Sequence, residues 1–134
     1  MNKEYLAKII AKDSQGLQLI SACCYQSKVK VDEIKFLKKN KIFLINLERF
    51  NYENNKSNEK INSICKFEFV DTVKSKNIDQ NNKNIILELL AINLFKKGKN
   101  IEIALLFKDN AFITLSTENI IEVTLEDQYK KKND

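Results

Sequence analysis

Apolar and polar side chains alternate one by one over much of the last third of the chain. Residues 101–107 alternate Ile, Ile, Leu and Phe with Glu, Ala and Leu, and residues 121–126 alternate Ile, Val and Leu with Glu, Thr and Glu. A period of two is that of a β-strand with one buried face. Asp109 and Asn110 are turn residues that tolerate positive φ. We therefore predict a hairpin that returns over residues 112–116, and one more strand at 121–125.

The same period begins at Lys28, but the apolar positions change phase by one residue near Asp32 and Glu33. An uninterrupted strand would then place half of its apolar side chains in water, so a bulge or bend must intervene. The pattern predicts a kink at these two residues, a polar turn over 38–41 and a second strand over 42–50.

Two further apolar segments follow, separated by polar loops at 51–60 and 74–84. The first is a half-exposed strand whose apolar face carries Cys65, Phe67, Phe69 and Val73. The second, residues 85–95, is apolar on both faces, and its length allows a helix or a strand. We favour a central strand because β-rich segments lie on both sides of it.

One helix is expected near the N-terminus, after a short strand over residues 5–11. Asp13 and Ser14 are good N-cap residues, and the apolar side chains that follow have helical spacing, which predicts a helix from Gln15 to about Tyr25. Gly16 weakens the first turn only slightly. The fold class is therefore α+β and mainly antiparallel β, with about eight strands forming a curved sheet or small barrel with one helix.

The chain has the length and composition of one domain. Its 134 residues, 43% of them hydrophobic, suffice for a packed core, so we expect a single domain over 1–134 that ends in a charged tail at 128–134. No apolar run is long enough for a signal peptide or a membrane span. We expect a cytoplasmic protein without membrane contact, and the sequence does not determine its oligomeric state.

The chain contains no histidine, tryptophan or proline, and Arg49 is its single arginine. The usual general base near neutral pH and the commonest metal ligand are thus missing. The two glycines cannot form a phosphate-cradling loop, and neighbouring carboxylates such as Asp32 and Glu33 are better read as solvated. We expect no catalytic, metal-binding or cofactor-binding residues, and an enzyme ranks third among the possible functions.

The cysteines and lysines also have simple structural readings. Cys23, Cys24 and Cys65 are odd in number and lack the spacing of a zinc knuckle, so we expect reduced, buried thiols. On a helix, adjacent Cys23 and Cys24 would point about 100 degrees apart, so at most one should face the core. The net charge of +5 comes from scattered lysines without clustered arginine, which disfavours nucleic acid as a partner.

Three segments together resemble a family of small, uncharacterised alphaproteobacterial proteins, domain of unknown function 2948. The segments are ISACCYQSKVKVDEIKFLKKNKIFLINLERFNYE, FEFVDTVKSKNID and IEIALLFKDNAFITLSTENIIEVTLED. Where the family tends to show Asn-Arg-Phe-Asp-Trp-Glu, this chain keeps Arg49 and Phe50 but has Tyr52 in place of Trp. Where the family tends to show Arg-Gly before Ile-Asp, it has Lys76 and Asn77. The resemblance supports the fold and supplies no function.

Arg49 is the residue that stands out, since its planar fork makes contacts that lysine cannot. The structural interpretation is a pair with an internal carboxylate such as Glu48, Glu53 or Asp71, or a stem that covers Phe50 or Tyr52. It is preferred over ligand binding. Two functions remain. The first is a noncatalytic protein-interaction or adaptor module whose sheet face or edge binds another protein. The alternative is a small-ligand or nucleic-acid binding domain that uses Arg49, Tyr52 and nearby lysines.

Overall fold

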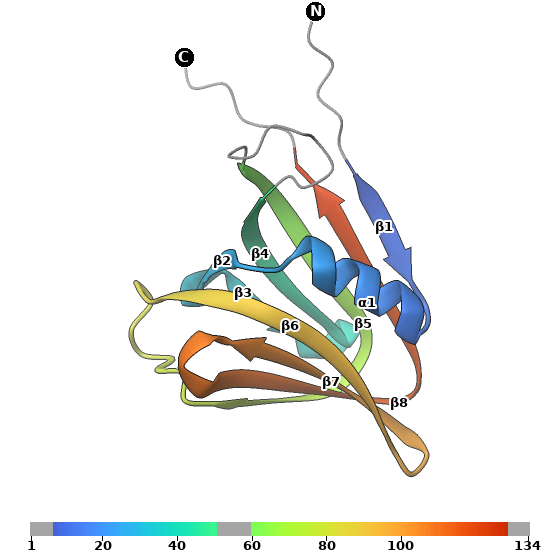
Figure 1. The fold of residues 1–134 in the computed structure, drawn as a ribbon. Coiled ribbons are helices and arrows are strands. Elements are labelled where there is room, and N and C mark those ends of the chain that lie inside the picture. Colours follow the sequence, from blue (N-terminus) through green and yellow to red (C-terminus); the bar gives the residue numbers. More distant parts are fainter. Residues whose placement is uncertain (1–6, 51–59, 129–134) are drawn as a thin grey trace, which may run out of the picture.

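The computed structural model describes residues 7–50 and 60–128, and within them eight strands form one antiparallel sheet that closes on itself (Figure 1). The strands are β1 (Lys8–Ala11), β2 (Ser27–Lys30), β3 (Ile34–Leu37), β4 (Ile42–Phe50), β5 (Lys60–Lys76), β6 (Ile86–Lys97), β7 (Asn100–Phe107) and β8 (Ala111–Asp127). Neighbours follow the order β8-β5-β4-β2-β6-β7, and β7 pairs back onto β8. The predicted class is confirmed as a closed six-stranded barrel with one helix, α1 (Ser14–Cys23).

The long strand β8 closes this barrel. It pairs with β5 along most of its length, with β7 through Ala111–Thr117 and with β1 through Val123–Glu126. We expected separate strands at 112–116 and 121–125, which is wrong. Residues 118–120 are exposed, but they form an irregularity within one strand and no turn, so both segments pair with β5 and the register shifts between them.

The same irregularity corrects the prediction that Phe69 lies on the buried face of β5. Phe69 has a φ of 63° and is 41% exposed, because the register with β8 shifts between Glu68 and Val70 and turns Val70 into the core instead. A further shift before Thr72 restores the original phase, so Val73 packs against the core as predicted.

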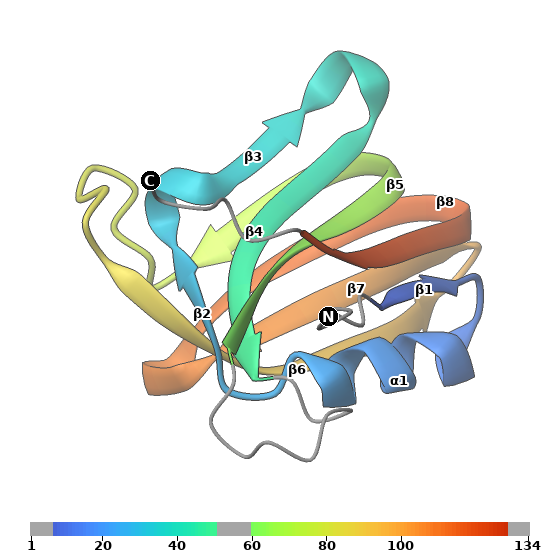
Figure 2. The ribbon, with the colours of Figure 1, turned by 90° about the horizontal axis from the view of Figure 1, so that it is seen from above.

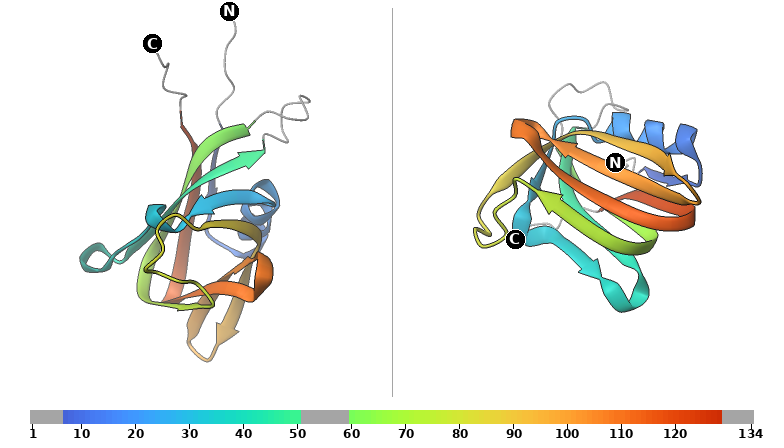
Figure 3. Two further views of the ribbon diagram at one scale, coloured as in Figure 1. Left: turned by 90° about the vertical axis from the view of Figure 1, so that its left-hand side faces the viewer. Right: turned by 90° about the horizontal axis from the view of Figure 1, so that it is seen from below.

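The predicted kink at Asp32 and Glu33 is a 3₁₀ turn at Val31–Glu33. On one side of this turn β2 pairs with both β6 and β4, whereas on the other side β3 pairs with β4 alone. The polar turn is a 3₁₀ turn at Lys38–Asn40, and β4 has the predicted bounds. The β3–β4 hairpin therefore projects from the barrel wall (Figure 3).

The remaining strand predictions hold, with small differences in where the strands begin and end. Segment 85–95 is a strand, β6, and the β7–β8 turn has positive φ at Asp109 and Asn110 as predicted. The first strand begins at Lys8, and its expected residues 5 and 6 lie outside the described part of the chain, as does most of the predicted loop at 51–60. Strand β5 continues through Lys76, so the second polar loop begins later than expected.

Helix α1 packs against β1 and β6 at the side of the barrel (Figure 1). The Asp13 side chain accepts a hydrogen bond from the Gly16 N–H at 2.8 Å and caps the first turn. The helix buries Leu17, Ile20 and Cys23. It ends two residues earlier than predicted, and Cys24, with φ −98° and ψ 2°, leaves the helical conformation. For this reason Cys23 and Cys24 are both buried, contrary to our expectation.

Gly16 allows this close packing, and its replacement tests it. A Cβ at this position would lie 2.9 Å from the Ala11 Cβ and 3.0 Å from the Ala11 Cα, too close for either atom. We expect Gly16→Ala to lower the free energy of unfolding by about 1–3 kcal/mol, although alanine favours helix. Denaturant unfolding measures the change, with Gln18→Ala as the exposed helical control. A Gly16→Ala protein as stable as the control would contradict the packing.

Candidate functional site

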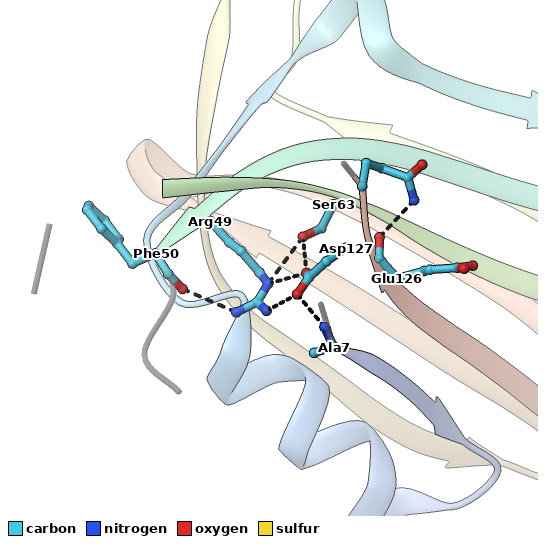
Figure 4. Close-up of polar contacts among 7 residues, drawn as sticks. Ala7, Arg49, Phe50, Ser63, Glu126 and Asp127 are labelled. Atoms are coloured by element: carbon cyan, nitrogen blue, oxygen red, sulfur yellow. Dashed lines mark hydrogen bonds and ion pairs between the residues drawn. The ribbon is translucent and has the colours of Figure 1, made fainter. Parts of the chain in front are cut away.

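Arg49 is wholly buried and lies near the C-terminal end of β4. Its guanidinium meets the Asp127 carboxylate in a two-point contact, with Nε 3.0 Å from Oδ1 and Nη2 2.8 Å from Oδ2 (Figure 4). Arg49 Nε also donates to Ser63 Oγ at 3.2 Å, and Nη1 donates to the Phe50 carbonyl at 3.2 Å. We call Arg49, Ser63 and Asp127 the clamp.

The clamp joins three strands of the barrel and the start of the chain's first described strand. Ser63 on β5 lies directly opposite Asp127 on β8 and donates to its Oδ1 at 2.6 Å. The Ala7 N–H donates to Asp127 Oδ2 at 2.8 Å, and the Asp127 N–H returns a bond to the Ala7 carbonyl at 3.0 Å. Both carboxylate oxygens of Asp127 therefore accept hydrogen bonds inside the fold, which compensates for the burial of its charge.

These contacts confirm an internal carboxylate partner for Arg49, but the three expected partners were wrong or lie outside the described residues. Glu48 lies 3.7 Å from Lys60, Asp71 lies 3.0 Å from Lys41, and Glu53 is in the part that the structure does not describe. A signal for Asp127 was present in the sequence. It continues the alternation Ile121, Val123, Leu125 and so points into the barrel. Tyr52, the other candidate residue, also lies outside the described residues.

Removal of one clamp partner should destabilise the fold. We expect Arg49→Ala to cost about 3–5 kcal/mol because it leaves Asp127 buried and unpaired, and Arg49→Lys to cost less while losing the planar fork. Combining Arg49→Met with Asp127→Leu should recover most of this loss. Thermal unfolding measures the series, and Lys28→Ala, which breaks an exposed pair with Glu88, should change the melting temperature far less. An Arg49→Ala protein with unchanged melting temperature would refute the structural role.

The clamp should also make stability depend on pH in acid. Burial raises the pKa of Asp127, but the hydrogen bonds from Arg49, Ser63 and the Ala7 N–H together lower it by more than burial raises it. The pKa of Asp127 therefore lies below the ordinary 3.8. A lowered carboxyl pKa contributes stability that is complete above pH 3.8 and is lost as the pH falls through the folded-state value. We expect Asp127→Asn to flatten this acid limb relative to wild type, as monitored by urea unfolding at a series of pH values. An equally steep limb in the variant would place the pH dependence elsewhere.

The three cysteines are buried and free of disulfides, in agreement with their expected role as small core residues. Burial, with the nearby Cys24, raises the pKa of Cys65 well above its ordinary value. A thiol of this kind is a poor nucleophile and a poor metal ligand at neutral pH. In residues 7–50 and 60–128, no three carboxylate or thiol side chains gather as a metal site would require.

A cavity of about 520 Å³ opens at the other end of β4, β5 and β8 from the clamp. We call it the β3 groove because β3 forms one of its walls. Its floor is apolar and comes from side chains that pack on or within the core. These floor residues are Val31, Ile34, Phe36, Phe43, Val73, Ile78 and Ile113.

The polar rim of the β3 groove consists of Asp32, Lys35, Ser75, Gln80 and Lys83. The segment 77–85 forms the wall opposite β3 and is fixed by its own hydrogen bonds. Gln80 Nε2 donates to Ser75 Oγ at 2.8 Å, the Asn81 N–H donates to Asp79 Oδ1 at 3.0 Å, and the Val31 N–H donates to the Ile85 carbonyl at 3.0 Å. Two of these bonds tie the wall to its neighbours, Ser75 on β5 and Val31 in the 3₁₀ turn before β3.

Strand β3 has no strand on the side away from β4 among the residues that the structure describes (Figure 2). Its neighbour β2 pairs with Ile86–Leu89 of β6, but β6 does not extend as far as β3. Alternate residues of an edge strand direct N–H and C=O groups away from the sheet. The groove therefore combines an apolar floor with a row of backbone groups able to pair with an added strand.

The comparisons with known proteins identify a family and nothing more. The family model described as protein of unknown function (DUF2948) matches residues 7–133. No curated protein and no solved structure matches the chain. A search of the described residues for a helix long and apolar enough to cross a membrane found none.

Proposed function

The chain belongs to the protein family of unknown function DUF2948, and we propose that it is a noncatalytic, cytoplasmic protein-interaction module that binds its partner at the β3 groove. One observation carries the proposal, namely that the edge of β3 that no described strand covers lies beside the apolar floor of the groove. An extended segment of another protein can add to such an edge by backbone hydrogen bonds, while a neighbouring pocket receives its side chains.

The length and charge of β3 favour a specific partner over non-specific strand pairing. Strand β3 has only four residues, and its exposed Lys35 discourages pairing with arbitrary strands. Of its other side chains, Ile34 and Phe36 pack against the core and Leu37 is 43% exposed. A partner must therefore gain most of its affinity from both features together, the backbone edge and the apolar floor.

The alternative function places a small ligand or a nucleic acid at Arg49 and Tyr52. It would require the Arg49 guanidinium to reach solvent, whereas this side chain is 0% exposed and is engaged by Asp127. A small apolar ligand at the β3 groove is the stronger second candidate, because about 520 Å³ lies within the range of small-molecule pockets, roughly 300–1,000 Å³. The unpaired edge favours a peptide, since a small apolar molecule would leave it unused.

Proline substitutions on β3 test the proposal. Since N–H groups alternate in direction, either Lys35→Pro or Phe36→Pro removes only an outward N–H, and the other removes a bond to β4. The variant that keeps the wild-type melting temperature is used to capture proteins from native lysate, in parallel with wild type. We expect it to lose partners that wild type captures, as quantified by mass spectrometry. A proline at Lys96, on the exposed end of β6, is the matched control. Identical sets of captured proteins for wild type and the stable β3 variant would refute binding at this edge.

A further inference from the structure

We infer that the partner segment is an extended, acidic peptide that adds as a strand to β3, places an apolar side chain on the floor of the β3 groove and sets carboxylates beside Lys35 and Lys83. This inference rests on the proposed function and deepens it by assigning the chemistry of the partner. Three features carry it: the depth of the apolar floor, the unpaired lysines of the rim and the ordered wall opposite β3.

The floor requires an apolar side chain. Phe43 and Ile113 are 1% and 3% exposed and form the deepest part, while Ile34, Phe36 and Val73 are partly buried around them. The space of about 520 Å³ accommodates a branched or aromatic side chain together with part of the backbone that carries it. Burial of such a side chain contributes most of the affinity of a peptide of this type.

The rim selects for negative charge. Lys35 and Lys83 line the groove, and neither has a carboxylate within ion-pair distance among the described residues. Other lysines are already paired, such as Lys28 with Glu88 at 2.7 Å and Lys41 with Asp71 at 3.0 Å. Asp32 is the one carboxylate on the rim, and the exposed Lys38 and Lys39 follow β3 directly. The groove therefore presents an excess of unpaired positive charge to a bound segment.

The backbone of β3 determines the conformation of the partner. The strand spans four residues, so about four residues of a partner can pair with it at roughly 3.3 Å per residue. Successive side chains of that segment then alternate between the groove floor and the rim. An alternating pattern of apolar and acidic residues fits this arrangement. Because segment 77–85 is held by its own hydrogen bonds, binding does not require the wall to become ordered.

An unbiased selection from a phage-displayed library of random linear peptides tests the chemistry, with the full chain as bait. We expect the enriched peptides to alternate Asp or Glu with Val, Ile, Leu or Phe. The probe for affinity is then a fluorescein-labelled synthetic peptide with the enriched sequence, measured by fluorescence anisotropy. Lys35→Glu combined with Lys83→Glu should weaken this probe about tenfold or more, because attraction becomes repulsion. Asp32→Asn should tighten it.

Lys96→Glu combined with Lys97→Glu is the matched control, since it makes the same change of charge on exposed residues at the far end of β6. A merely structural role for the rim would not produce opposite effects from Lys35 and Asp32. Enrichment of basic or proline-rich peptides, no enrichment at all, or equal binding by rim and control variants would each overturn the inference. A different outcome is that the selected peptides are non-acidic and bind the stable β3 proline variant more weakly than wild type. That outcome would overturn only the proposed chemistry of the partner and would still support binding at β3.

Discussion

The fold depends on the closure of the barrel by β8 and on the charge pair that fixes the end of this strand. Strand β8 has partners on both sides through most of its length, so it joins the two ends of the sheet. Asp127, its last residue, is held by Arg49 from β4, Ser63 from β5 and the backbone of Ala7 before β1. A buried pair of this kind is costly to desolvate and is not necessarily more stable than an apolar replacement. What it adds is specificity of register, because a slip of β8 by one residue would carry the Asp127 side chain away from both partners.

Closure also determines where another protein can attach. Within a closed barrel every strand has two neighbours, so few backbone groups remain for a partner. Strand β1 lies outside the ring, but α1 packs beside it. Strand β3 leaves the ring at the 3₁₀ turn Val31–Glu33, where β6 ends its pairing with β2. The groove thus results from the same phase change that is visible in the sequence near Asp32, and a local irregularity has become an accessible edge.

Local patterns in the sequence predicted the strands well and long-range partners poorly. The polar segments on either side gave β4 its bounds, and the change of phase in the apolar alternation located the bend after β2, because each depends on neighbouring residues only. The orientation of Phe69 was missed because a register shift depends on the pairing of β5 with β8. Asp127 was missed as the partner of Arg49 because 78 positions separate them, although its phase already placed it inside. Asn77 is a related case, since its φ of 62° suits Asn as well as the Gly typical of the resembled family.

The clamp and the β3 groove occupy opposite ends of the same three strands. Strand β4 contributes Arg49 to one and Phe43 to the other, while β5 and β8 contribute Ser63 and Asp127 to the clamp and Val73 and Ile113 to the groove. Arg49 and Phe43 are six positions apart on β4, about 20 Å at the rise of a strand. Substitutions this far apart without shared partners have nearly additive effects. Stability and the proposed binding should therefore be separable in this molecule: a clamp variant that remains folded should keep an intact groove, and a rim variant should keep an intact clamp.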